Sequence, residues 1–115
     1  MNSIISDVKT LLGISTDDEY FDQNIILFIN SAFSKLSQIG VGSTKPFKII
    51  TGSETWTDFM QDDLLLESIK EYIFAKVKIA FDPPINKTSM DALQSIINED
   101  EWRLSVAYKQ SEGGD

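Results

Sequence analysis

Residues 62–84 read DDLLLESIKEYIFAKVKIAFDPP, and this stretch decides the fold. Its pattern predicts a helix over 62–81, because Pro83 and Pro84 forbid continuation beyond about Phe81. The charged residues share one narrow stripe of the helical projection: Glu67, Lys70, Glu71 and Lys78. Apolar residues cover roughly two-thirds of the circumference, far more than the ~100° stripe of a surface helix. The helix is therefore either central in its own domain or shared with a neighbouring subunit.

Two residues interrupt this pattern. Lys76 falls in the middle of the apolar arc, where its ammonium group must either reach a carboxylate or extend to water. Phe74 lies on the charged stripe instead. Isolated exposed aromatic side chains are common, but a neighbouring subunit would also explain this one. Both residues are candidates for an interface.

Three further helices are predicted around this one. Residues 3–12 carry apolar side chains at helical spacing and stop at Gly13. Thr16 and Glu19 have the spacing of a capping box, so the second helix is expected over 17–39. The last helix starts near Thr88 and runs to about Val106, and residues 110–115 are expected to be a flexible tail.

The last helix has one large side chain away from its apolar stripe. Trp102 points to the side of Val106, and Trp is enriched at binding hot spots. Packing beneath the segment between the second and third helices is the alternative. Trp102 and Val106 are thus interface candidates.

The span from residue 40 to 61 is long for a connection in so small a domain. Residues 47–51 and 54–59 could pair as a β-hairpin around Gly52-Ser53, with Pro46 limiting pairing at its start. We expect a mobile functional loop or hairpin that faces a partner or a channel, and whose shortening leaves folding intact. Phe47 and Trp56 are its interface candidates.

The predicted fold is therefore mostly α: one domain over 1–109, a small bundle of about four helices with an inserted loop or hairpin at 40–61. A length of 115 residues with 42% hydrophobic content suits a single domain with a real core. No run approaches the roughly 18–20 apolar residues that span a bilayer, and the start lacks the features of a signal peptide. We expect a soluble protein without a membrane partner.

The composition excludes several kinds of active site and metal site. Cysteine and histidine are both absent, which excludes disulfides, the usual zinc sites and the commonest general base. Carboxylates cluster at 17–22, 62–63 and 99–101, but the first two clusters coincide with predicted helix starts. The third runs along a helix, where consecutive side chains diverge. We expect no catalytic residues, cofactor or metal, although a small carboxylate enzyme is a rival hypothesis.

The net charge of −8 disfavours conventional nucleic-acid binding, because basic surfaces normally neutralise phosphates. A second rival is an acidic regulatory protein that mimics DNA and binds a host protein. Such a protein should present a long exposed array of acids, whereas many acids here fall at predicted helix starts.

Two stretches resemble the head-tail connector (adaptor) proteins of long-tailed double-stranded DNA phages. The opening IISDVKTLLGISTDDEYFDQNIILFINSAFSKL has a short helix, an acidic cap and a long helix. The later stretch LLLESIKEYIFAKVKIAFDPPINKTSMDALQSIINEDEWRLSVA, with its phrase Phe81-Asp82-Pro83-Pro84, is similar to the later helices of connector-like proteins. The 40–61 insertion departs from the generic pattern.

The resemblance implies a structural subunit of a homo-oligomeric ring, commonly of twelve copies, docked beneath the portal protein. Such a ring extends the DNA channel and receives the stopper or tail-completion protein, while DNA passes without specific binding. The implied location is the virion at the head-tail interface, with assembly in the bacterial cytoplasm.

Overall fold

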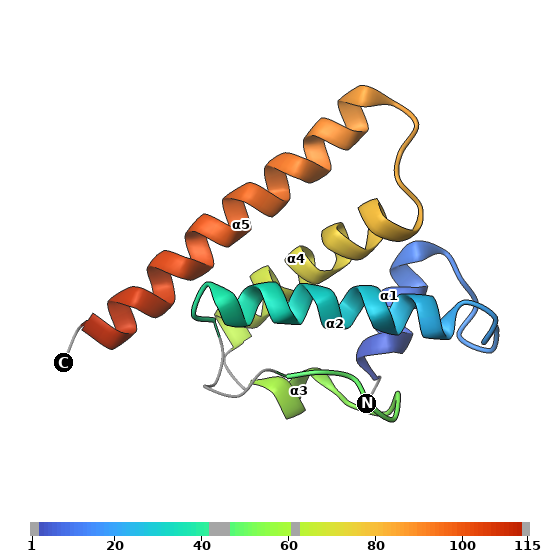
Figure 1. Cartoon of the computed structure of the whole chain (residues 1–115), viewed down its shortest axis with the longest axis horizontal. Coiled ribbons are helices and arrows are strands. Elements are labelled where there is room, and N and C mark those ends of the chain that lie inside the picture. The colour runs from blue at the N-terminus through green and yellow to red at the C-terminus, as the bar shows by residue number, and fades with distance from the viewer. Residues whose placement is uncertain (1–2, 42–46, 61–62, 114–115) are drawn as a thin grey trace.

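The computed structural model describes residues 3–41, 47–60 and 63–113, and the described part is mostly helical, as predicted. Its helices are α1 (Ile4–Leu12), α2 (Asp22–Gln38), α3 (Trp56–Phe59), α4 (Asp63–Phe81) and α5 (Lys87–Gly113). Helix α4 lies between α2 and α5, and α1 packs against both α2 and α4 (Figure 1). The long α5 runs diagonally across the body, which measures 46 × 35 × 20 Å.

Helix α4 is the centre of the bundle. Among the described residues it buries more side chains than any other helix: Leu66, Ile69, Tyr72, Ile73, Ala75 and Val77. Its neighbours within the same chain therefore cover most of the wide apolar surface read from the sequence. Glu67 and Glu71 of the charged stripe remain exposed. Leu64, at the start of the helix, is also exposed.

Helix α1 has the ends that its sequence predicts. The Ser3 hydroxyl accepts a hydrogen bond from the Ser6 N–H at 3.2 Å, which caps the first turn. Gly13 ends the helix with φ of 80°, a left-handed conformation that costs a glycine little. Local sequence chemistry is sufficient to place this helix.

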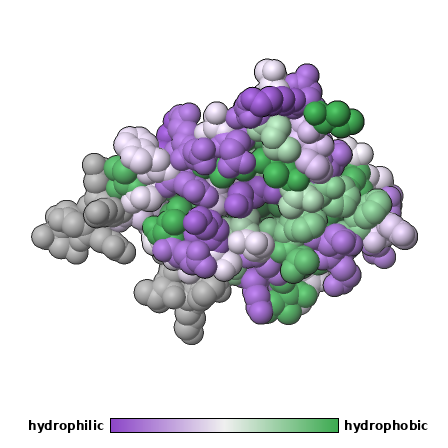
Figure 2. Space-filling view, turned by 45° about the horizontal axis from the view of Figure 1, so that its top comes forward, coloured by the Kyte–Doolittle hydropathy of each residue, from purple (hydrophilic) through white to green (hydrophobic). Residues whose placement is uncertain are grey.

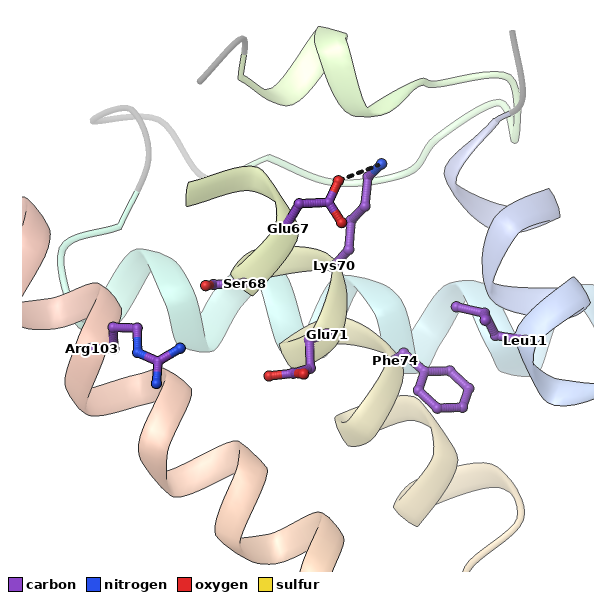
Figure 3. Close-up of a pocket in the computed structure, with 7 residues that line it drawn as sticks. All are labelled: Leu11, Glu67, Ser68, Lys70, Glu71, Phe74 and Arg103. Atoms are coloured by element: carbon purple, nitrogen blue, oxygen red, sulfur yellow. Dashed lines mark ion pairs between the residues drawn. The ribbon is translucent and has the colours of Figure 1, made fainter. Parts of the chain in front are cut away.

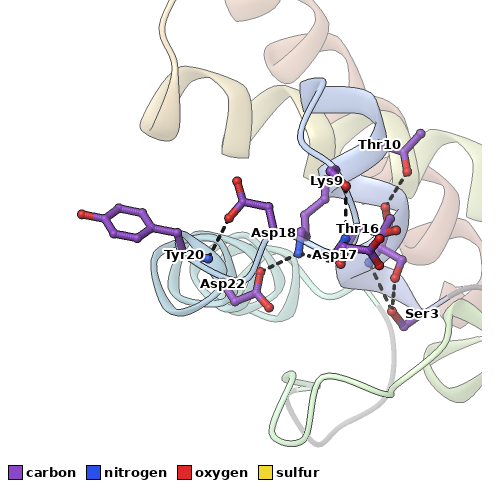
Figure 4. A network of polar contacts seen from close by, with 10 residues as sticks. Ser3, Lys9, Thr10, Thr16, Asp17, Asp18, Tyr20 and Asp22 are labelled. Carbon is purple, nitrogen blue, oxygen red and sulfur yellow. Dashed lines mark hydrogen bonds and ion pairs between the residues drawn. The ribbon is translucent and has the colours of Figure 1, made fainter.

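The start of α2 was predicted wrongly. The helix begins at Asp22 rather than at residue 17, and residues 15–21 form turns instead of a capping box. The buried Lys9 is the reason: its Nζ donates to the Thr16 carbonyl at 3.2 Å and to Asp22 Oδ1 at 2.8 Å (Figure 4). An ammonium group that is 3% exposed needs these acceptors, so a tertiary contact overrides the local capping signal.

The predicted β-hairpin is not found. Within described residues 47–60 there is no strand, and α3 occupies the second half of the expected hairpin. The Asn30 side chain on α2 takes the place of a partner strand, because it donates to the Ile49 carbonyl at 3.0 Å and accepts from the Ile49 N–H at 2.6 Å. An amide has both a donor and an acceptor, so one side chain satisfies both backbone groups.

A turn around Gly52 is closed by a single carboxylate. Glu54 accepts hydrogen bonds from the N–H groups of Ile50 at 2.8 Å, Thr51 at 3.1 Å and Gly52 at 2.9 Å. Burial alone would raise the pKa of Glu54, but these backbone donors lower it to about 2. The Glu54 carbonyl also accepts from the Ile4 N–H at 2.8 Å, which ties the turn to α1.

The described part of the insertion belongs to the core, so the expectation of a mobile loop independent of folding is wrong for residues 47–60. Ile49 and Trp56 are buried, at 3% and 7% exposure. The rings of Phe47 and Phe59 pack on Phe33 of α2 with centroid distances of 5.0 and 4.8 Å. Phe47 and Trp56 were read as partner-facing, but together with Ile49 and Phe59 they pack in or against the hydrophobic core. Residues 42–46 and 61 lie outside the described residues.

Helix α5 extends past the predicted end at Val106 and reaches Gly113. The predicted flexible tail is therefore helical over 110–113, while residues 114–115 lie outside the described part of the chain. The extension retains a tertiary contact beyond the predicted end: the Tyr108 hydroxyl lies 3.8 Å from the Met60 sulfur. Beyond Val106 the apolar residues of α5 no longer recur at regular helical spacing. The periodicity therefore predicted an end for this helix that is too early.

Two adjacent isoleucines test whether the insertion is core. Ile49→Ala should lower the free energy of unfolding by about 2–4 kcal/mol, because a buried side chain is removed. Ile50→Ala should change it by less than about 0.5 kcal/mol, since that side chain is 75% exposed. Urea unfolding followed by circular dichroism measures both. Equal effects of the two substitutions would contradict a core role.

The Lys9 contact gives a second stability prediction. Asp22→Asn should destabilise the protein by roughly 2 kcal/mol, because it removes the only carboxylate paired with Lys9 among the described residues. Asp18→Asn is the control, since the Asp18 carboxylate accepts only from the exposed Tyr20 N–H at 3.0 Å in the described contacts. Thermal unfolding of both variants at low and high salt checks the difference, which should persist at high salt because Lys9 is buried.

Candidate interaction surfaces

The described surface exposes several large apolar side chains, and they are scattered over different elements. They are Leu11, Tyr20, Phe21, Leu27, Ile50, Leu64, Ile85 and Trp102. Figure 2 shows hydrophobic side chains gathered on one side of the view and bordered by hydrophilic ones. Single exposed apolar residues are ordinary, so exposure alone does not mark an interaction surface.

Trp102 lies where the sequence predicts, on the outer side of α5. It is 69% exposed, whereas Ile97 and Leu104 on the inner side are buried. Val106, one turn beyond Trp102, is half-buried. The alternative, that Trp102 packs beneath the insertion, is wrong at this level of exposure. Whether a second protein covers Trp102 and Val106 stays a prediction.

Phe74 lines a groove on the other flank of α5. The groove has a volume of about 410 Å³, and we call it the α1–α4 groove (Figure 3). Its lining comes from α1, α4 and α5: Leu11, Glu67, Ser68, Lys70, Glu71, Phe74 and Arg103. Phe74 is half-buried there, on the same side as Leu11. The charged stripe and its aromatic interruption thus form one concave surface.

The cations of this groove are engaged with neighbours in the same chain. Lys70 Nζ lies 3.8 Å from Glu67 Oε1 and 5.6 Å from the centroid of the Trp56 ring. Arg103 forms an ion pair with Glu99 one turn earlier on α5. Both contacts are at least partly exposed, so each contributes little to stability. The two cations that line the groove, Lys70 and Arg103, therefore each have a carboxylate partner within the chain.

Asp100 lies behind the groove, at the joint between α4 and α5. It is 1% exposed, it shares a side-chain hydrogen bond with Glu71, and its Oδ2 has no hydrogen-bond partner in the described part of the chain. Burial first, and then the neighbouring Glu71 carboxyl, raise the pKa of Asp100 to about 7, while Arg103 acts in the opposite direction. Burial and the hydrogen bond to Glu71 therefore both favour the protonated form of Asp100.

Sequence reasoning missed this site. It treated residues 99–101 as diverging side chains on one helix, which is correct, but the meeting of Asp100 with Glu71 depends on how α5 packs on α4. The adjacent Glu101 takes part in the same joint, because the Tyr72 hydroxyl donates to Glu101 Oε2 at 2.8 Å. Burial and this carboxylate raise the pKa of Tyr72. A buried acid two positions before an exposed tryptophan gave no periodic signal.

Lys76 lines a second, smaller groove of about 220 Å³ between α2, α4 and α5. Its Nζ lies 5.9 Å from the centroid of the Tyr72 ring, and the side chain is half-buried. The lysine stem therefore covers apolar surface while the charge faces an aromatic ring. Its role in an interface stays a prediction.

Phe47 and Trp56 are not on the outer surface predicted for them. Phe47 is half-buried against Phe33, and Trp56 is buried with its Nε1 donating to Asp7 Oδ2 at 2.7 Å. The packing of both side chains is explained within one chain. Any contact with a partner would involve only their exposed edges.

Within residues 3–41, 47–60 and 63–113, the carboxylates form no group of three or more that could hold a metal ion. Over the same residues no helix has the length and apolar character needed to cross a membrane.

The sequence model of the phage connector protein family matches residues 4–111. The chain belongs to this family. The resemblance read from the sequence is thereby confirmed, and it extends across the insertion that departed from the generic pattern. No curated protein and no solved structure matches the chain.

Family membership fixes the coarse role of this connector protein. It is a structural component of the phage head-tail connection, and it works by contacting other proteins of the phage particle.

Asp100 gives the connector a pH-dependent stability. Because its pKa is raised on folding, its stabilising effect is full below about pH 4 and is lost as the pH rises through 7. Asp100→Asn should therefore be more stable than the wild type at pH 8, by on the order of a few kcal/mol, with the difference shrinking towards pH 4. Urea unfolding between pH 4 and pH 8 measures it. Asp91→Asn, on the exposed side of the same helix, should show no such trend.

Proposed function

We propose that the connector assembles into a homo-oligomeric ring beneath the portal protein. The ring extends the DNA channel and presents the attachment surface for the stopper or tail-completion protein. This function is the finer form of the role given by the family match to residues 4–111. The assembled ring would be part of the virion, with assembly in the host cytoplasm.

The exposed Trp102 is the observation that supports a self-assembling interface best. It points away from the core at 69% exposure, on a helix whose inner side already packs on α4. A ring needs two different surfaces on each subunit, because each subunit contacts its two neighbours through non-identical patches. The outer side of α5 with Trp102 and Val106, and the α1–α4 groove with Phe74, are two separate surfaces of this kind.

The charge of the chain supports a DNA conduit over a DNA-binding role. The net charge of −8 repels phosphates, and a ring repeats that charge around its axis. Four of the ion pairs lie on helix surfaces at spacings of three or four residues, so acids and cations alternate there. This alternation disfavours the DNA-mimic alternative, which needs a continuous array of exposed acids.

Trp102→Ala and Phe74→Ala, made separately, test this function. Trp102→Ala should leave thermal unfolding of the free subunit within about 0.5 kcal/mol of wild type. It should weaken each subunit contact by about 2 kcal/mol or more, and a ring repeats that loss at every junction. Phe74→Ala should cost some stability as well, since that side chain is half-buried. Electron microscopy of the protein alone and mixed with its portal measures assembly.

Tyr20→Ala is the matched control, because Tyr20 is an aromatic residue 82% exposed on the turn before α2. It should assemble as the wild type does. Normal rings from Trp102→Ala would remove that residue from the interface, and a stable monomer that captures a host enzyme would favour the mimic.

A further inference from the structure

Trp102 and the α1–α4 groove are complementary in shape. The indole is 69% exposed on the outer side of α5, about 140° around the helix from the buried Ile97, which lies five residues before it. It therefore stands out from the body of its own chain. The groove is a hollow of about 410 Å³. A cavity of roughly 150 Å³ already holds a benzene ring, so this groove is large enough for an indole.

The two apolar side chains that line the groove lie together at one end of it. Leu11 of α1 is 60% exposed and Phe74 of α4 is half-buried, and Figure 3 shows both at the end remote from Arg103. Leu11 also borders a neighbouring hollow of about 230 Å³, which Trp56 lines as well. Apolar walls from two helices favour an aromatic ring, because docking removes its surface and theirs from water together.

The polar wall of the groove fits the remaining part of a tryptophan side chain. Docking buries the indole N–H, which then needs an acceptor. Glu71 lies exposed on the groove wall, and a carboxylate that makes one hydrogen bond to Asp100 has further accepting capacity. The chain already pairs an indole with a carboxylate, since Trp56 Nε1 donates to Asp7 Oδ2 at 2.7 Å.

Local charge permits two copies to meet at these surfaces, although each copy carries a net charge of −8. The groove is lined by two acids and two cations: Glu67, Glu71, Lys70 and Arg103. On α5, the residues that flank Trp102 include Glu99 and Arg103, which form an ion pair. Neither surface therefore presents an excess of negative charge to the other.

We propose that Trp102 of one copy docks in the α1–α4 groove of the next copy, with Leu11 and Phe74 against its ring and Glu71 accepting a hydrogen bond from its Nε1. This rests on the proposed function, and it names the surfaces that meet at each subunit junction. A second copy is favoured over another protein because every copy carries both halves of the contact, on different helices. Such a head-to-tail contact repeats around a ring when the rotation closes.

The lack of cysteine makes thiol cross-linking a direct test, because an introduced thiol is the only one in the chain. Thr10→Cys places a thiol beside Leu11, and Asn98→Cys places one a turn before Trp102; both positions are exposed. The two full-length variants, one of them labelled with ¹⁵N, are mixed and treated with a short bis-maleimide. Mass spectrometry should find mixed dimers at a yield at least about tenfold that of dimers of either variant alone.

A second substitution in each partner separates the docked side chain from chance proximity. Trp102→Ala in the Asn98→Cys protein should lower the yield of mixed dimers at least about tenfold, because the anchor is lost. Leu11→Ala in the Thr10→Cys protein should lower it as well, since one apolar wall is removed. Leu27→Ala is the matched control, because this leucine of α2 is 64% exposed, much as Leu11 is, and it should leave the yield unchanged.

A third thiol position tests the other groove. Ser31→Cys lies in the groove that Lys76 lines, between α2, α4 and α5. If it links to Asn98→Cys in place of Thr10→Cys, the indole of the neighbouring copy lies in that groove and the proposal is wrong. Linking of Asn98→Cys chiefly to itself would show a two-fold contact and equally overturn it. Mixed dimers that survive Trp102→Ala, or a mixture without mixed dimers, would do the same.

The outcome is separable from that of the proposed function. Rings seen by electron microscopy without mixed dimers would leave the ring standing and assign its junctions to other surfaces. Mixed dimers without rings, with or without the portal, would leave the contact between Trp102 and the groove standing in an open chain of subunits, and would remove the ring.

Discussion

The structure depends on the need to cover α4 on nearly every side. A helix whose apolar residues extend over most of its circumference cannot lie on a surface without exposing them to water. Here α2 packs on one side and α5 on another, and α1 covers part of the remaining surface. Among the described side chains of α4, Glu67 and Glu71 on the charged stripe stay exposed, as do Leu64 and Ala80 near its two ends. Because the covering helices are fixed by α4, the groove along that stripe is fixed as well.

Buried polar groups then determine the parts that are not helical. Lys9 holds the turn before α2 through the Thr16 carbonyl and Asp22, and Asn30 holds the backbone of Ile49. The folded protein would be less stable if either of these groups were left without a hydrogen-bond partner in the core. The connecting segments are therefore shaped by satisfying hydrogen bonds, rather than by local turn preference.

Asp100 differs from these groups, because its hydrogen-bonded neighbour is another carboxyl group, that of Glu71, and its Oδ2 has no partner among the described residues. A small structural protein with no cysteine or histidine has few ways to respond to its surroundings. The buried Asp100 provides one, because its ionisation changes the stability of the joint between α4 and α5.

The sequence by itself determined the central helix, the ends of α1 at Ser3 and Gly13, the stop before Pro83 and the outward direction of Trp102. Each follows from periodicity or capping, which act over a few residues. It could not place the start of α2, the packing of Phe47 and Trp56, or the meeting of Glu71 with Asp100. Those features depend on contacts between segments as much as 49 residues apart, such as Trp56 with Asp7. Only the tertiary structure decided them, because burial brings distant polar and apolar groups together and their joint desolvation outweighs local preference.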